Sequence, residues 1–193
     1  MEHSSVNQVS ELSPIYNPDS FQRLDDTDDG QFYKKDRFVG HLDSLALQTV
    51  EDVIGNLIVE KSPVVLDLMA GWDSHIPEGL KPGKVVGLGL NENELKSNKG
   101  LDEYVLHDIN NDPRLPFPDA SFDAVINTVS VDYMTRPVEV FKEAGRILKP
   151  GGLMLVIFSN RMFPQKAVRL WRESSEDERV IVVDEFFKEA GVF

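Results

Sequence analysis

Cysteine is absent from the 193-residue sequence. This absence excludes disulfide bonds, thiolate zinc sites and cysteine nucleophiles, and it is typical of a reducing compartment. No apolar run approaches the roughly 20 residues that a membrane-spanning helix needs. The N-terminal stretch also lacks a basic region followed by an apolar one, so we expect no secretory signal and no membrane partner, and we predict a cytoplasmic protein.

Basic residues are scarce relative to acidic ones: 20 lysines and arginines stand against 33 aspartates and glutamates, for a formal net charge of -13. Such a charge repels phosphate groups, so we expect no nucleic-acid partner and favour a small-molecule one. A basic group late in the chain has a spacing typical of a solvated helix face. It consists of Arg161, Lys166, Arg169 and Arg172.

The sequence predicts a division into two parts. Residues 1–31 are polar and acidic and predict a flexible N-terminal arm, whereas residues 32–193 predict a single domain. Residues 25–36 imitate a calcium loop, but Thr27 and Asp36 are poor matches at the third and twelfth ligand places. An acidic turn is therefore favoured there, and no metal site is predicted. Apolar residues at three- and four-residue steps predict an amphipathic helix over 36–60.

Short apolar runs separated by helical patterns dominate the rest of the chain. The predicted strands cover residues 64–68, 84–90, 103–109, 122–130 and 151–159. Continuous apolar strands between helices predict an α/β fold: a doubly wound, mostly parallel, Rossmann-like sheet with helices on both faces. Because ligands bind at the carboxyl ends of the strands in such sheets, the functional residues are expected just after each run.

Four segments carry a family resemblance: VVLDLMAG, VVGLGLNENEL, LPFPDASFDAVINTVSVDYM and RILKPGG. Over roughly residues 60–160 they resemble the class I S-adenosylmethionine-dependent methyltransferases, in particular the small-molecule branch. The preceding stretch FYKKDRFVGHLD also resembles that of an uncharacterised subgroup of these proteins. The resemblance implies an enzyme that uses S-adenosyl-L-methionine and transfers its methyl group in line to a small molecule.

The resemblance also implies the cofactor-binding residues. It places Asp67 near the methionine amino end, and Asp108 with the Ile109 amide near the adenine. Gly71 lets the backbone approach the ligand where a side chain would collide. The implied set is Asp67, Met69, Gly71, Leu90, Asn91, Asp108, Ile109, Thr128 and Val129.

Two departures from the family pattern concern this site. Gly89 stands where the family usually has an acidic residue that binds both ribose hydroxyls, and each lost charged hydrogen bond costs about 1.5 to 3 kcal/mol. Asn91 or Glu92 could compensate from the next turn. Met69 and Asp73 stand where the family commonly has glycine, so the first loop could crowd the methionine part of the ligand.

A third departure concerns the C-terminal end. The family sheet normally continues with two more strands, whereas here the sequence ends on a helical pattern, so we expect C-terminal strands to be missing. The fifth strand would then be an open edge, and a homodimer through that edge is a further expectation.

Catalysis by direct displacement needs little beyond positioning and exclusion of water. Should the acceptor have to lose a proton, His75, Asp132 and Tyr133 are the candidate bases. Phe32, Tyr33 and Arg37 are candidates for a lid over the substrate mouth.

The sequence leaves a second function open and disfavours a third. The missing ribose carboxylate and the short C-terminus leave open a non-catalytic binding or scaffold protein on the same fold. A nicotinamide oxidoreductase is disfavoured, because LMAGWDSH does not supply the G-x-G-x-x-G turn that such enzymes need after the first strand.

Overall fold

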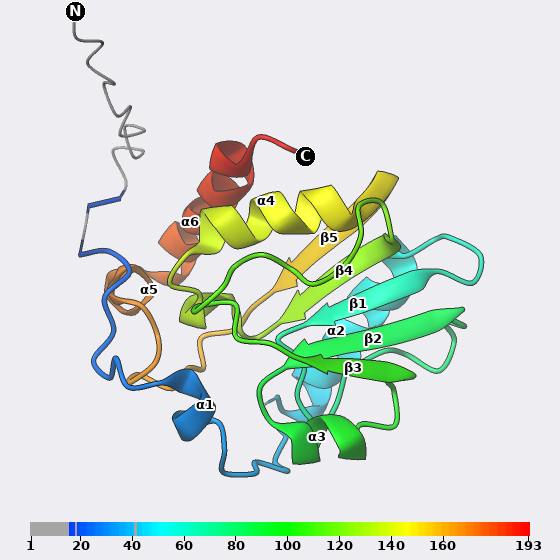
Figure 1. Cartoon of the computed structure of the whole chain (residues 1–193), viewed down its shortest axis with the longest axis horizontal. Coiled ribbons are helices and arrows are strands. Elements are labelled where there is room, and N and C mark those ends of the chain that lie inside the picture. Colours follow the sequence, from blue (N-terminus) through cyan, green and yellow to red (C-terminus); the bar gives the residue numbers. More distant parts are fainter. Residues whose placement is uncertain (1–15, 18, 41) are drawn as a thin grey trace, which may run out of the picture.

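Five parallel strands form the centre of the protein (Figure 1). The computed structural model describes residues 16–193 apart from 18 and 41. The sheet order is β3-β2-β1-β4-β5, and each neighbouring pair is parallel. The strands are β1 (Val64–Leu68), β2 (Lys84–Gly89), β3 (Glu103–Leu106), β4 (Phe122–Thr128) and β5 (Leu148–Ile157). This confirms the predicted doubly wound parallel sheet, whose strand order reverses between β1 and β4.

Helices cover both faces of the sheet, as predicted. On one face, α4 (Pro137–Ile147) and α6 (Glu176–Ala190) pack Phe141 and Phe186 against Leu66 and Val125 of the sheet. On the other face, α2 (Ser44–Leu57) packs Ile54 against strands β1 and β4. The smaller elements are α1 (Asp29–Phe32), α3 (Glu92–Ser97), η1 (Val131–Tyr133) and α5 (Arg169–Glu173). In the described part of the chain, no helix combines the length and apolar character needed to cross a membrane.

Capping side chains explain where several helices begin. Asp43 accepts a hydrogen bond from the Ala46 amide and starts α2, so the helix predicted from residue 36 begins eight residues later. Asn91 starts α3 in the same way, by accepting from the Glu94 amide. Since Asn91 stands two residues after the end of β2, its cap fixes α3 at the carboxyl edge of the sheet.

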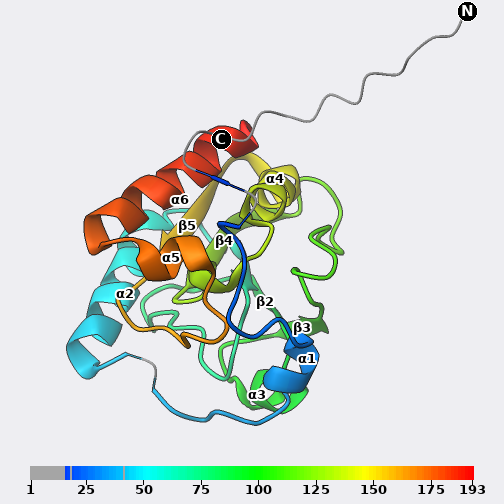
Figure 2. The same ribbon diagram turned by 90° about the vertical axis from the view of Figure 1, so that its left-hand side faces the viewer.

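The segment before α2 lies on the domain surface. The first 15 residues of the predicted arm lie outside the described residues. Farther along, the amides of Arg169 and Leu170 donate to the carbonyls of Gln22 and Ser20, each at 2.8 Å. Figure 2 shows this segment (blue) running past α5 to α1. The part of the arm from residue 16 onward therefore packs on the domain, and the division at residue 32 stays a prediction.

Candidate functional site

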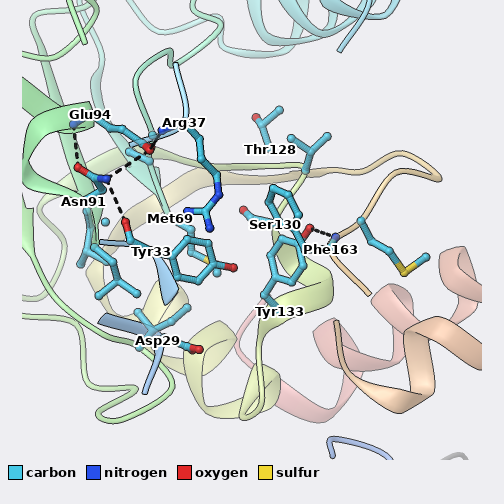
Figure 3. A pocket seen from close by; sticks show the side chains of 18 of the residues that line it. Asp29, Tyr33, Arg37, Met69, Asn91, Glu94, Thr128, Ser130, Tyr133 and Phe163 are labelled. Atoms are coloured by element: carbon cyan, nitrogen blue, oxygen red, sulfur yellow. Dashed lines mark hydrogen bonds between the residues drawn. The ribbon is translucent and has the colours of Figure 1, made fainter. Parts of the chain in front are cut away.

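A cavity of about 640 Å³ opens at the carboxyl ends of the strands (Figure 3). All five strand ends and the segment of residues 29–40, called the strap below, contribute to its wall. Eight of the nine residues that the resemblance implied line the cavity: Met69, Gly71, Leu90, Asn91, Asp108, Ile109, Thr128 and Val129. The topology thus gathers side chains that are far apart in the sequence, and their part in binding a cofactor stays a prediction.

Asp67, the ninth residue, lies in the interior rather than in the cavity wall. Its side chain is 4 % exposed, and its Oδ2 atom has no hydrogen-bond partner among the described residues. Burial raises the pKa of Asp67 to about 7, against the opposing effects of Ser74 and His75. Asp67 can therefore act on a ligand only through the loop above it.

The loop after β1 contains a strained residue. Met69 has a φ of 65°, in the left-handed region that costs a non-glycine residue roughly 1–2 kcal/mol. Val129, after β4, has a φ of 49° and also lines the cavity. Strained backbone of this kind is concentrated at functional sites. Met69, which stands where the family commonly has glycine, thus places a side chain in the cavity wall, and its left-handed backbone conformation costs free energy.

Gly89 has no room for any side chain. A Cβ atom there would lie 2.3 Å from the carbonyl oxygen of Ala70 and 3.3 Å from Leu95 Cδ2. The two backbones approach closely because the Ala70 amide donates a 2.8 Å hydrogen bond to the Leu88 carbonyl. An acidic residue is therefore excluded at position 89 by the packing of the first loop on β2.

The two residues suggested as substitutes for that acid are engaged elsewhere. Asn91 caps α3 through Oδ1, and its Nδ2 donates to the Tyr33 carbonyl and to Asp36 Oδ1, both at 2.9 Å. Glu92 is exposed, outside the cavity wall, and paired with Lys96 at 2.9 Å. Asn91 lines the cavity with its polar atoms already engaged, whereas Glu92 lies outside the wall, so a role of either side chain in binding the ribose stays a prediction.

Glu94 is the carboxylate that the sequence analysis missed. Its Oε1 accepts a 2.7 Å hydrogen bond from the Arg37 amide, and its Oε2 lies 3.4 Å from where a Cβ of Gly71 would be. Burial raises its pKa, against the lowering effect of the Arg37 amide. Figure 3 shows Glu94 beside Asn91 and Arg37. In the sequence, the one signal for Glu94 is its position three residues after Asn91, which caps α3.

Of the three candidate bases, only Tyr133 lines the cavity. Its hydroxyl accepts a 2.8 Å hydrogen bond from the Phe163 amide, and burial raises its pKa, so it stays protonated. Asp132 is 3 % exposed and behind the wall, and burial raises its pKa to about 7. His75 lies in a separate, smaller hollow.

His75 is paired with Asp73 at 3.2 Å in that smaller hollow. Burial lowers the pKa of His75, but the hydrogen bond and charge of Asp73 outweigh this effect, and the pKa is raised. The geometry gives His75 a structural partner and no access to the main cavity.

The strap is held at both ends. At one end, buried Asp29 lies 2.7 Å from Arg23 Nη1 and 3.1 Å from Lys166 Nζ, and it accepts from Asn110 Nδ2 at 2.9 Å. These partners occupy the carboxylate of Asp29, which stands at the fifth ligand place of the calcium-loop pattern. At the other end, the Arg37 amide is bound by Glu94.

Tyr33 and Arg37 of the predicted lid line the cavity, whereas Phe32 packs behind them. The basic group expected on one solvated helix face is divided, because Arg161 lines this cavity and Lys166 is fully buried. Tyr33 and Arg37 share the cavity with further wall residues from the segments after β4 and β5. These are Ser130 after β4, and Ser159, Asn160, Arg161, Met162, Phe163 and Pro164 after β5.

Comparison with known proteins agrees with this geometry. Residues 68–156 match the family model described as a methyltransferase domain. Demethylmenaquinone methyltransferase from Geobacillus stearothermophilus is 36% identical over 120 residues, covering 55% of this chain and 50% of that protein. The chain spans about half the length of the curated relatives it matches.

Two solved structures are similar in fold. A SAM dependent methyltransferase from Aquifex aeolicus has a TM-score of 0.52 and 20% identity, covering 74% of this chain and 80% of that one. The YcgJ protein from Bacillus subtilis has a TM-score of 0.54 and 18% identity, covering 76% and 79%. At these identities the likeness concerns the fold alone.

Proposed function

We propose that the protein is a class I methyltransferase that transfers a methyl group from S-adenosyl-L-methionine to a small molecule, because residues 68–156 match the methyltransferase-domain family model and the fold is similar to that of a solved SAM dependent methyltransferase. One observation carries the proposal. A single cavity joins the loop after β1, the start of α3 and the ends of β3, β4 and β5, with room for a cofactor and a second molecule.

The residues present fit the cofactor. Gly71 brings bare backbone to the cavity wall, as close approach of a ligand requires, whereas Gly89 lacks a side chain because Ala70 packs against it. Glu94 Oε2 supplies a carboxylate oxygen for the ribose hydroxyls where position 89 cannot. Asp108 and Ile109 would hold the adenine, since Asp108 uses only Oδ1 to accept from the Asn110 amide at 2.9 Å. When bound, the cofactor supplies a methyl group activated on a sulfonium.

The chain's own contribution is positioning and exclusion of water. Tyr33, Tyr133 and Phe163 give the acceptor side of the cavity an aromatic wall, and the ring centroids of Tyr133 and Phe163 lie 6.0 Å apart. The strap supplies Tyr33 and Arg37 to the wall on this side. We assign no catalytic base among the three candidates, because Tyr133 holds its proton and neither Asp132 nor His75 lines the cavity.

Isothermal titration with S-adenosylhomocysteine tests the proposal. Micromolar binding supports a cofactor site and justifies an acceptor screen with methyl-labelled cofactor. No binding to the folded chain contradicts it. Binding without transfer to any acceptor favours the second candidate, a non-catalytic binding protein, which the Met69 side chain in the cavity wall and the glycine at position 89 motivate.

We propose a cytoplasmic location and pairing of two copies along β5, which forms one edge of the described sheet. Light scattering of the purified protein at several concentrations tests the second proposal, and a constant monomer mass contradicts it.

A further inference from the structure

Arg37 places a guanidinium group in the cavity wall (Figure 3). Its Nη1 donates to the Lys35 carbonyl and its Nη2 to the Phe32 carbonyl, each at 3.0 Å. The guanidinium carbon lies 4.7, 5.5 and 5.4 Å from the ring centroids of Phe32, Tyr33 and Phe163. The side chain is half-buried and fixed in orientation by these contacts.

This guanidinium has no carboxylate within 4.0 Å among the described residues. Arg23 and Arg146, which are also shielded from solvent, lie 2.7 and 2.6 Å from the carboxylates of Asp29 and Asp119. A charge that is partly removed from water normally has an opposite charge beside it. Glu94 contacts Arg37 through the main-chain amide, and no carboxylate of the described residues contacts the guanidinium itself, which in a chain with a net charge of -13 favours an anionic ligand at this cavity.

The group is also arranged to bind an anion. A guanidinium has five N–H donors in a rigid plane, and the two carbonyl contacts leave the others for a ligand. The faces of the surrounding aromatic rings are only weak acceptors for those N–H groups. The backbone of Arg37 is anchored by Glu94, so little conformational freedom is lost when an anion binds.

We propose that Arg37 binds a carboxylate of the molecule that occupies this cavity. This inference rests on the proposed function, since it assigns one end of the ligand within the same site. The carboxylate belongs to one of two sources: the amino-acid end of the cofactor, or the methyl acceptor. The planar fork of arginine suits a carboxylate better than a single ammonium would.

Titrations of the full chain with two ligands separate the sources. S-adenosylhomocysteine carries the amino-acid carboxylate, whereas 5′-methylthioadenosine shares its adenosine and lacks that end. If the cofactor supplies the carboxylate, Arg37→Gln weakens binding of S-adenosylhomocysteine about 10- to 100-fold and leaves 5′-methylthioadenosine unchanged. Lys34→Gln, an exposed change in the same strap, is the matched control and alters neither affinity.

If S-adenosylhomocysteine binds both proteins equally, the second arm uses protein saturated with it. Benzoate and benzyl alcohol are then titrated, and loss of benzoate binding alone in Arg37→Gln assigns the carboxylate to the acceptor. The inference is overturned if Arg37→Gln leaves the affinities for S-adenosylhomocysteine and benzoate unchanged. It is also overturned if the variant loses as much affinity for 5′-methylthioadenosine as for S-adenosylhomocysteine. Failure of the unsubstituted chain to bind either adenosine ligand overturns the proposed function and this inference together.

Discussion

The main-chain amide of Arg37 donates a 2.7 Å hydrogen bond to Oε1 of Glu94, and this bond ties the strap to α3. The second oxygen of Glu94 lies on the cavity side, near Gly71. Asp36 strengthens the same junction by accepting from Asn91 Nδ2 at 2.9 Å. The Glu94 carboxylate therefore contacts the strap with one oxygen and faces the expected ligand space with the other. We expect ligand binding and the position of the strap to be linked through Glu94.

Replacing Glu94 by glutamine is the sharpest test of this link. Glu94→Gln keeps an acceptor for the Arg37 amide but removes the charge that would bind ribose hydroxyls. We expect the affinity for S-adenosylhomocysteine, measured by titration calorimetry, to fall about tenfold, since a hydrogen bond to a charged group contributes roughly 1.5–3 kcal/mol. Glu92→Gln, exposed on the same helix, is the control. Equal losses in the two variants would show that Glu94 has no special role.

The left-handed backbone at Met69 predicts an unusual order of stability for the glycine and alanine variants of this residue. Glycine normally stabilises a fold less than alanine, but the φ of 65° at this position penalises every residue with a Cβ. Met69→Gly and Met69→Ala both remove the same packing, so we expect the glycine variant to be more stable by about 1 kcal/mol in urea unfolding. The reverse order would show that the loop relaxes when the side chain is lost.

The same two variants test the predicted crowding of the first loop. Higher affinity for S-adenosylhomocysteine in both variants than in the unsubstituted chain would mean that the Met69 side chain occupies ligand space. Lower affinity in both would mean that the side chain contacts the ligand.

The fold and the position of the site could be predicted from local patterns of apolar residues in the sequence. The apolar runs that became β1 and β4 are buried on both faces, which only a sheet between two helix layers provides. Their ends then had to meet at one edge, and that is why Gly71 and Thr128 line one cavity. The family resemblance drawn from the same segments is confirmed by the match over residues 68–156.

What the sequence did not predict depends on contacts between distant segments. Glu94 reaches the cavity because the Asn91 cap sets the direction of α3, and Asp29 is buried because Lys166 comes from 137 positions later in the chain. Asp67 is hidden because the loop after β1 folds over it. None of these placements has a periodic or compositional signal.

Lys166 should hold the strap against the domain. Its side chain is fully buried, and its Nζ lies 3.1 Å from Asp29 Oδ1 and 2.6 Å from the Thr27 carbonyl. Because removing one partner of a buried pair typically costs about 3–5 kcal/mol, Lys166→Met is expected to lower the free energy of unfolding by that amount in urea titrations. Lys34→Met, an exposed change in the strap, is the control. Similar midpoints for both variants would place the anchor of the strap elsewhere.

The buried carboxylate of Asp67 should make stability depend on pH near neutrality. Burial raises its pKa to about 7 in the folded protein, whereas an unfolded aspartate titrates near 3.9, at its ordinary value. Between these values the native state holds a proton that the unfolded state has released, so the free energy of unfolding falls as pH rises from about 4 to 7. Asp67→Asn removes this contribution. The free energy of unfolding of the variant, measured in urea at pH 5, 6 and 7, should therefore rise relative to that of the unsubstituted chain by up to about 1.4 kcal/mol per pH unit.

Asp132, whose pKa burial also raises to about 7, leaves a residual pH dependence of stability in the variant. The exposed control Asp52→Asn should parallel the unsubstituted chain at every pH, and the same parallel course for Asp67→Asn would mean that its carboxylate ionises freely in the folded state.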